Sequence, residues 1–159
     1  MGAEMSQAEI ARRVAVLRRF KALLGQQRER FRNYLALLEN QETVIGSGSG
    51  EEILAHVELE GRVVADIFST QRVIRPLEDM YLAAAPRDPA DDGVSSLKTA
   101  LEDLKAKAQA QSAKNRELLS VRMAGIRAEM NVLKDSPFVK SARSVYGDVV
   151  APSLVDVKG

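Results

Sequence analysis

A seven-residue repeat of large apolar side chains runs through the first third of the chain. Its six members are Ile10, Leu17, Leu24, Phe31, Leu38 and Ile45. Because an α-helix advances about 3.6 residues per turn, a spacing of seven places all six along one narrow stripe. A stripe of this length is suited to packing against other helices. The repeat therefore predicts a rod of packed helices.

Capping residues and helix breakers divide the chain into segments. Ser6 and Ser49 are each followed three residues later by a glutamate, which is the capping-box pattern of a helix start. The Gly-Ser run at residues 46–50 is expected to end the first helix and to supply a left-handed glycine cap. Turn-forming residues at 86–93 and the Ser136-Pro137 pair mark two further helix ends.

These boundaries predict an all-α fold, either a long antiparallel helical hairpin or a three-helix coiled-coil-like bundle. The bundle should cover residues 1–136, with a flexible C-terminal tail at 137–159. The predicted helices span about 6–45, 51–85 and 95–135. A bend is expected near residues 72–76, where Pro76 removes a backbone donor.

Two polar features bear on how the helices pair. The first predicted helix is rich in arginine and the second is rich in acidic residues, which favours their packing side by side. Asn115 falls on the apolar seam of the third helix. An asparagine at such a position specifies register at some cost in stability.

The composition excludes several classes of protein. The net charge is +1 with 28% charged residues, which argues against a dedicated nucleic-acid binder or a polybasic membrane anchor. The apolar runs are too short to cross a bilayer, and no cysteine is present. We expect a soluble, cytoplasmic protein that does not insert into membranes.

Catalytic chemistry has little support in the sequence. His56 is the only histidine and lies on an acidic helical segment, where we expect a surface or seam-edge residue. A lone histidine without cysteine cannot build a structural zinc site. The Glu-x-x-His pattern that would indicate a di-iron bundle does not occur in the sequence. We therefore predict no enzyme activity, no cofactor and no metal site.

The third predicted helix has more apolar residues than one seam needs. These residues spread around the helix and could form a groove for a partner helix, with methionine allowing more than one client. They are Leu118, Leu119, Val121, Met123, Ile126, Met130, Val132 and Leu133. The alternative is that both faces are buried inside the bundle or in a homodimer.

A family resemblance rests on this helix and the tail. Asn115 is followed by Leu118 and Leu119, and after a helix break the Tyr146-Gly147 pair follows. In this order the sequence resembles the FlgN-like flagellar type III export chaperones. It departs from them in the Gly-Ser break and in a longer tail after Gly147.

The resemblance implies a cytosolic chaperone that binds hook-associated proteins of the FlgK and FlgL type. It would keep them unpolymerised and deliver them to the flagellar export gate. The predicted client-binding residues are Leu119, Ile126, Met130 and Leu133, and the predicted export-gate docking residues are Tyr146 and Gly147. The alternatives are a coiled-coil scaffold or adaptor with another helical partner, and a nucleic-acid-associated helical protein.

Overall fold

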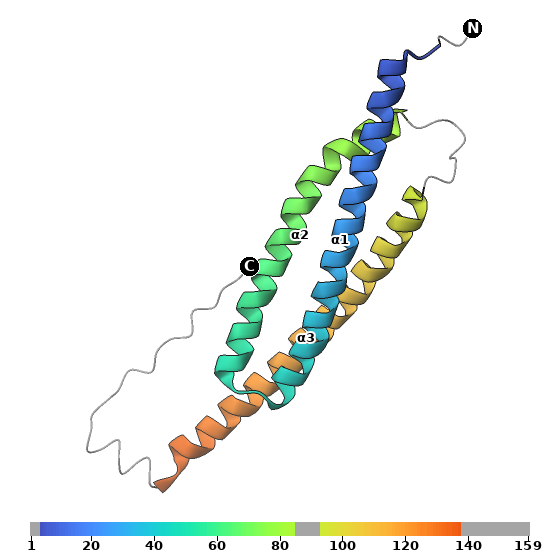
Figure 1. Ribbon diagram of the computed structural model, residues 1–159. Helices are drawn as coiled ribbons and strands as arrows, with labels where there is room; N and C mark the ends of the chain where they lie inside the picture. The colour runs from blue at the N-terminus through green and yellow to red at the C-terminus, as the bar shows by residue number, and fades with distance from the viewer. Residues whose placement is uncertain (1–3, 85–92, 138–159) are drawn as a thin grey trace. The chain divides into compact units, whose positions relative to one another are not determined.

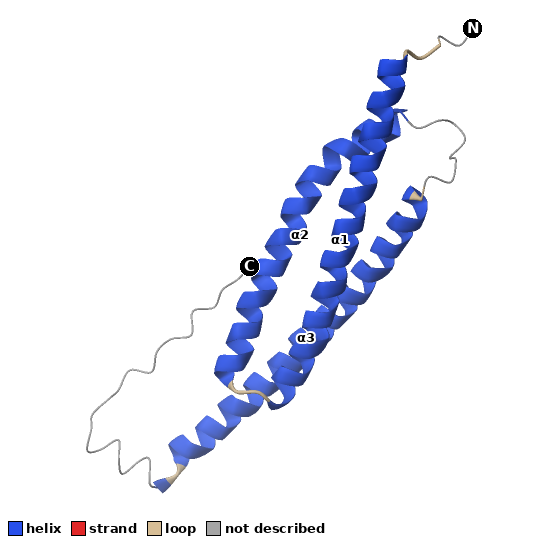
Figure 2. Ribbon diagram, viewed as in Figure 1, coloured by secondary structure: helices blue, strands red, loops and turns tan. Residues whose placement is uncertain are grey.

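The fold is all-α, as the heptad pattern predicts. The computed structural model describes residues 4–84 and 93–137. Its helices are α1 (Gln7–Ser47), α2 (Gly50–Ala84) and α3 (Val94–Asp135), and no strand occurs in these two ranges (Figures 1 and 2). The predicted helix bounds agree with the observed ones to within two residues.

By its packing the chain divides into two units, Met1–Leu119 and Ser120–Gly159. In the first unit α1 and α2 form an antiparallel hairpin, and the N-terminal part of α3 packs against it (Figure 1). The described part of the second unit is the C-terminal part of α3 and the two residues after it.

The two predicted N-caps are confirmed. The Oγ atom of Ser6 accepts a hydrogen bond from the Glu9 amide at 3.2 Å, and the Oγ atom of Ser49 accepts one from the Glu52 amide at 3.2 Å. Each bond satisfies an N–H group that has no partner inside its own helix.

The Gly-Ser break is shorter than predicted, and its geometry differs. Gly46 remains helical and Gly50 is already the first residue of α2, so only two residues connect α1 to α2. The predicted left-handed glycine cap is wrong, because the C-cap residue Gly48 is extended, with φ −79° and ψ 168°. Glycine fits this position for another reason: a Cβ atom on Gly48 would lie 2.7 Å from the carbonyl oxygen of Val44.

A compact apolar cluster holds the three helices together. Its buried members are Phe20, Leu23, Leu24, Ile74, Val94 and Leu101, drawn from all three helices. The ring of Phe20 packs on Tyr81 of α2 with 5.1 Å between the ring centroids. Burying large apolar side chains contributes about 1.5–3 kcal/mol each, so this cluster contributes strongly to the bundle's stability.

One end of the predicted stripe does not pack. Leu24, Leu38 and Ile45 are buried, but Ile10 is 46% exposed. Val94, the first residue of α3, packs in the cluster around Phe20. Ile10 precedes Phe20 by ten residues, which is about 15 Å of helix, so it lies beyond that cluster.

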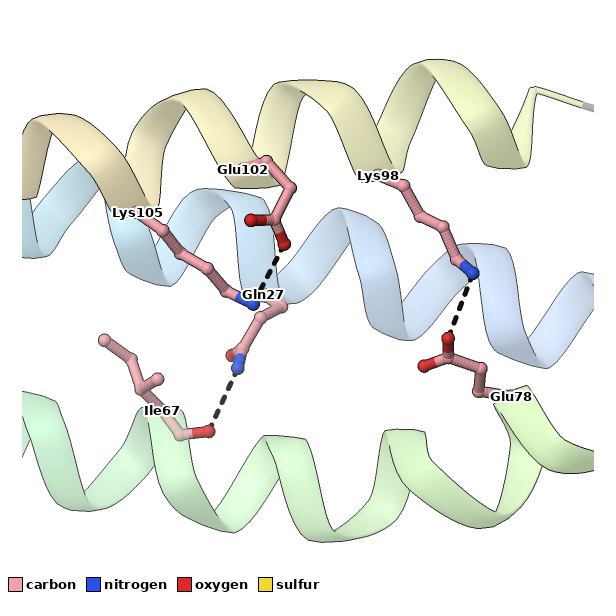
Figure 3. Close-up of polar contacts among 6 residues, drawn as sticks. All are labelled: Gln27, Ile67, Glu78, Lys98, Glu102 and Lys105. Atoms are coloured by element: carbon pink, nitrogen blue, oxygen red, sulfur yellow. Dashed lines mark hydrogen bonds and ion pairs between the residues drawn. The ribbon is translucent and has the colours of Figure 1, made fainter.

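The charge pairing between helices is sparser than expected. Arg30 of α1 pairs with Asp66 of α2 at 3.6 Å, and Lys98 of α3 pairs with Glu78 of α2 at 3.0 Å (Figure 3). Arg13, Arg28 and Arg32 pair with glutamates of α1 itself. Because such exposed pairs contribute well under 1 kcal/mol each, packing and not charge decides the arrangement.

Pro76 lies inside α2, which continues through it to Ala84. The ribbon of α2 bends in its yellow-green C-terminal part, the part to which Pro76 belongs, as the missing backbone donor predicts (Figure 1).

Candidate functional site

A chain of polar contacts fixes α3 on the hairpin. Asn115 is only 3% exposed, and its Nδ2 donates to the Leu38 carbonyl oxygen at 2.8 Å and to Gln41 Oε1 at 3.0 Å. Its Oδ1 accepts from Gln111 Nε2 at 2.9 Å. The predicted seam position of Asn115 is therefore confirmed. The buried amide is matched on both sides, so it defines one register of α3 against α1.

Two carboxylates extend this chain of contacts. Glu60 of α2 accepts from Gln41 Nε2 at 3.0 Å and from the Tyr34 hydroxyl at 3.1 Å. Desolvation of Tyr34, followed by the nearby charge of Glu60, raises the pKa of the Tyr34 phenol above its ordinary value. Glu42 pairs with Lys114 at 2.7 Å, and the hydrogen bond from Lys114 is the largest cause that lowers the pKa of that carboxyl.

After this network α3 exposes apolar side chains on a continuous face. Met123, Ile126, Met130 and Leu133 are 37%, 44%, 52% and 60% exposed. Their separations of three, four and three residues keep them on one side of the helix. We call these four residues the α3 stripe. All four lie in the second unit, in the stretch of α3 from residue 120 onward.

The two edges of the α3 stripe differ in charge. Arg127 and Lys134 are exposed, and each follows a stripe residue by one position, so they share one edge. Arg122 and Glu129 each precede a stripe residue by one position and share the other edge, which is therefore mixed in charge. An apolar face with one basic edge is suited to a partner helix that carries acidic residues on the matching side.

The structure separates one predicted client-binding residue from the others. Ile126, Met130 and Leu133 are exposed on the α3 stripe. Leu119 is half-buried in the first unit, where it lines a hollow with Ile45 and Ile53. Its contribution to client binding stays a prediction. Tyr146 and Gly147, the predicted docking residues, lie outside the described residues.

His56 is half-buried on α2, as the seam-edge interpretation predicts, and its Nδ1 has no hydrogen-bond partner. Within residues 4–84 and 93–137, no group of three or more histidine, aspartate or glutamate side chains is arranged to hold a metal ion. In the same ranges, no helix is long and apolar enough to span a membrane.

The fold and the stripe thus define a helical bundle with an uncovered apolar helix face. A protein of Treponema pallidum (strain Nichols), described as an uncharacterized protein, is 36% identical over 130 residues, which are 82% of this chain and 82% of that protein. The chain belongs to the same family as this Treponema protein. No family model matches the chain, and no solved structure matches it.

Proposed function

We propose that the protein is a cytoplasmic flagellar export chaperone that holds an amphipathic helix of a hook-associated protein against the α3 stripe. The observation that carries this proposal is the run of four exposed apolar side chains on a helix whose earlier part is anchored in a bundle. Large exposed apolar faces on soluble proteins are typical of interaction sites. The order of Asn115, the two leucines and the Tyr-Gly pair supports the flagellar assignment.

The physical task of such a chaperone fits this surface. A client with amphipathic terminal helices would self-associate if those helices were left bare. A helix laid along the α3 stripe buries both apolar faces without any covalent chemistry. Met123 and Met130 are flexible and polarisable, so one surface can adapt to more than one client.

The test compares two double variants of the full chain in binding to a purified hook-associated protein from the same genome. Met130→Asp with Leu133→Asp places two charges on the stripe, and we expect a loss of at least about a hundredfold in affinity by calorimetry. Val121→Asp with Val132→Asp adds the same charge at two exposed valines off the stripe. We expect that control to bind within about threefold of the unchanged chain.

Circular dichroism checks that both double variants keep their helix content. If both bound the client as tightly as the unchanged chain, the stripe would not be the client site. If the unchanged chain itself bound no hook-associated protein, the scaffold or adaptor function would become the better hypothesis.

Delivery to the export gate is proposed to depend on Tyr146 and Gly147. A tyrosine buries a large area with few torsions to freeze, so one such residue can anchor a weak interface. We expect Tyr146→Ala to leave the melting temperature and client affinity unchanged while client accumulates in the cell and filaments are lost. Normal motility in that strain would contradict the docking role.

A further inference from the structure

A second surface lies between the three helices of the first unit. It is a groove of about 430 Å³ that opens to solvent, with Phe31, Ile67 and Ala108 among its apolar lining residues. Phe68 of α2 also lines it and is 64% exposed. We call this surface the central groove. It shares no residue with the α3 stripe, so the inference does not depend on the proposed function.

Gln27 brings an unusual polar atom to the groove. The residue is 1% exposed, and its Nε2 donates to the Ile67 carbonyl oxygen at 3.0 Å (Figure 3). Its Oε1 is buried and has no hydrogen-bond partner. Buried polar atoms are nearly always paired in native proteins, and a buried acceptor without a donor is costly. Because this oxygen has almost no accessible surface in the chain alone, an O–H or N–H group in the groove supplies the missing donor when the Gln27 side chain turns toward it.

The charged side chains that line the groove are basic. Lys105 and Arg116 line it, and none of the described residues that line it is acidic. Lys105 Nζ lies 5.9 Å from the Phe31 ring centroid and pairs at 3.5 Å with the largely exposed Glu102 (Figure 3). Among the residues that the structure describes, no carboxylate lies within ion-pair distance of Arg116. Glu60 lies beside the groove, where it accepts hydrogen bonds from the lining residue Tyr34 and from Gln41. Arg116 is therefore the basic group of the groove that is suited to an anionic partner.

The size of the apolar surface favours a protein segment over a small molecule. The volume is within the range of ligand pockets, but most of the Phe68 side chain lies outside any enclosed space. A small ligand in the groove would leave that ring exposed. A helix crossing the mouth would cover the ring and fill the groove with a single side chain.

We propose that the central groove binds an acidic helix of a partner protein through one tyrosine or tryptophan. The aromatic ring packs between Phe31 and Phe68, and its O–H or N–H donates to Gln27 Oε1. A glutamate or aspartate one helical turn away pairs with Arg116. Phenylalanine in the anchor position lacks the donor, so the groove discriminates against it.

The probe for this proposal is a labelled helical peptide with one tyrosine and a glutamate four residues to either side. Two matched peptides replace the tyrosine with phenylalanine or both glutamates with glutamine. Binding is measured by fluorescence anisotropy to the full chain carrying Met130→Asp and Leu133→Asp, so that the α3 stripe does not contribute. We expect the tyrosine peptide to bind at least fivefold more tightly than the phenylalanine peptide and about tenfold more tightly than the glutamine peptide.

Two surface substitutions locate the binding site. Phe68→Ser and Arg116→Gln should each weaken binding of the tyrosine peptide by about tenfold or more. Leu54→Ser and Arg62→Gln change an exposed leucine and an exposed arginine of α2 outside the groove, and we expect no effect from either. Gln27→Leu should remove the preference for tyrosine over phenylalanine. If this variant failed to fold, the two peptides on the parent chain would still test the donor.

Three results would overturn the proposal. The first is the absence of binding at millimolar tyrosine peptide. The second is equal affinity for all three peptides. The third is binding that neither Phe68→Ser nor Arg116→Gln weakens. Because every measurement is made with the stripe disabled, none of these results bears on the client-binding proposal.

Discussion

Replacing Asn115 tests whether the buried polar contacts or the apolar seam sets the register of α3. The sequence alone predicts that Asn115→Leu stabilises the bundle, since an asparagine on a seam is usually a cost. The observed contacts predict the opposite, namely that Asn115→Leu lowers the free energy of unfolding. The Asn115 amide makes three hydrogen bonds of 2.8, 2.9 and 3.0 Å, and one partner, Gln41, is itself 4% exposed.

The size of the stability change depends on which hydrogen bonds the partners of Asn115 lose. The Leu38 carbonyl keeps its helical bond, and Gln111 keeps its bond to Glu42 at 2.6 Å. Gln41 Oε1 loses its donor, which costs about 1–3 kcal/mol for a buried acceptor. Asn115→Ala also leaves a void, so we expect a total loss of about 2–4 kcal/mol. For Asn115→Leu, Asn115 borders the hollow that Leu119 lines, so the larger side chain has room. The loss of the other two hydrogen bonds, about 0.5–1.5 kcal/mol each, adds to the unpaired acceptor and outweighs the gain from apolar burial.

Equilibrium urea unfolding measures these changes. Asn131→Ala is the matched control, because it makes the same substitution at an exposed asparagine of α3 and should change stability by less than about 0.5 kcal/mol. A double-mutant cycle of Asn115→Leu with Gln41→Leu should give a coupling above about 1 kcal/mol. A higher midpoint for Asn115→Leu alone, or a coupling near zero, would refute the reasoning.

Three further predictions concern the bundle. Phe20→Ala should cost about 3–5 kcal/mol in urea unfolding because the residue is fully buried, whereas Ile10→Ala should cost less than about 0.5 kcal/mol; equal losses would contradict the observed core. Gly46→Ala should raise the thermal midpoint, since the helical site has open space, and Gly48→Ala should lower it; the opposite order would contradict the linker geometry. The raised pKa of Tyr34 adds stability that is complete below its unfolded value of 10.0 and is lost as pH rises through the folded pKa. The drop in the urea midpoint above pH 10 should therefore shrink in Tyr34→Phe, and an unchanged drop would exclude that linkage.

The helices could be predicted from the sequence because their signals are local. Ser6 and Ser49 cap through atoms three residues away, and the heptad spacing acts along one helix. Ile10 was wrongly predicted to pack, because periodicity does not say how far a neighbouring helix reaches. The left-handed cap predicted for the Gly-Ser run is wrong, because the need for glycine at Gly48 comes from one close carbonyl and not from a left-handed φ.

The candidate sites also differ in whether a local sequence signal predicts them. The exposed part of the α3 stripe was predicted because its spacing is visible in the sequence, even though the separate position of Leu119 was not. No pattern in the sequence predicts the central groove. It brings together side chains from three helices, and its one sequence signal was Gln27, a polar residue three positions after Leu24 of the seam. Only the packed bundle shows that the side-chain oxygen Oε1 of Gln27 is buried without a hydrogen-bond donor.

Hydrogen exchange of the full chain with and without a purified hook-associated protein tests the central claim most directly. The α3 stripe is exposed in the chain alone, and a bound client helix would cover it and slow local opening. The proposed chaperone function predicts that amide exchange in residues 120–135 slows on addition of client. Unchanged exchange there in a saturated complex would contradict it.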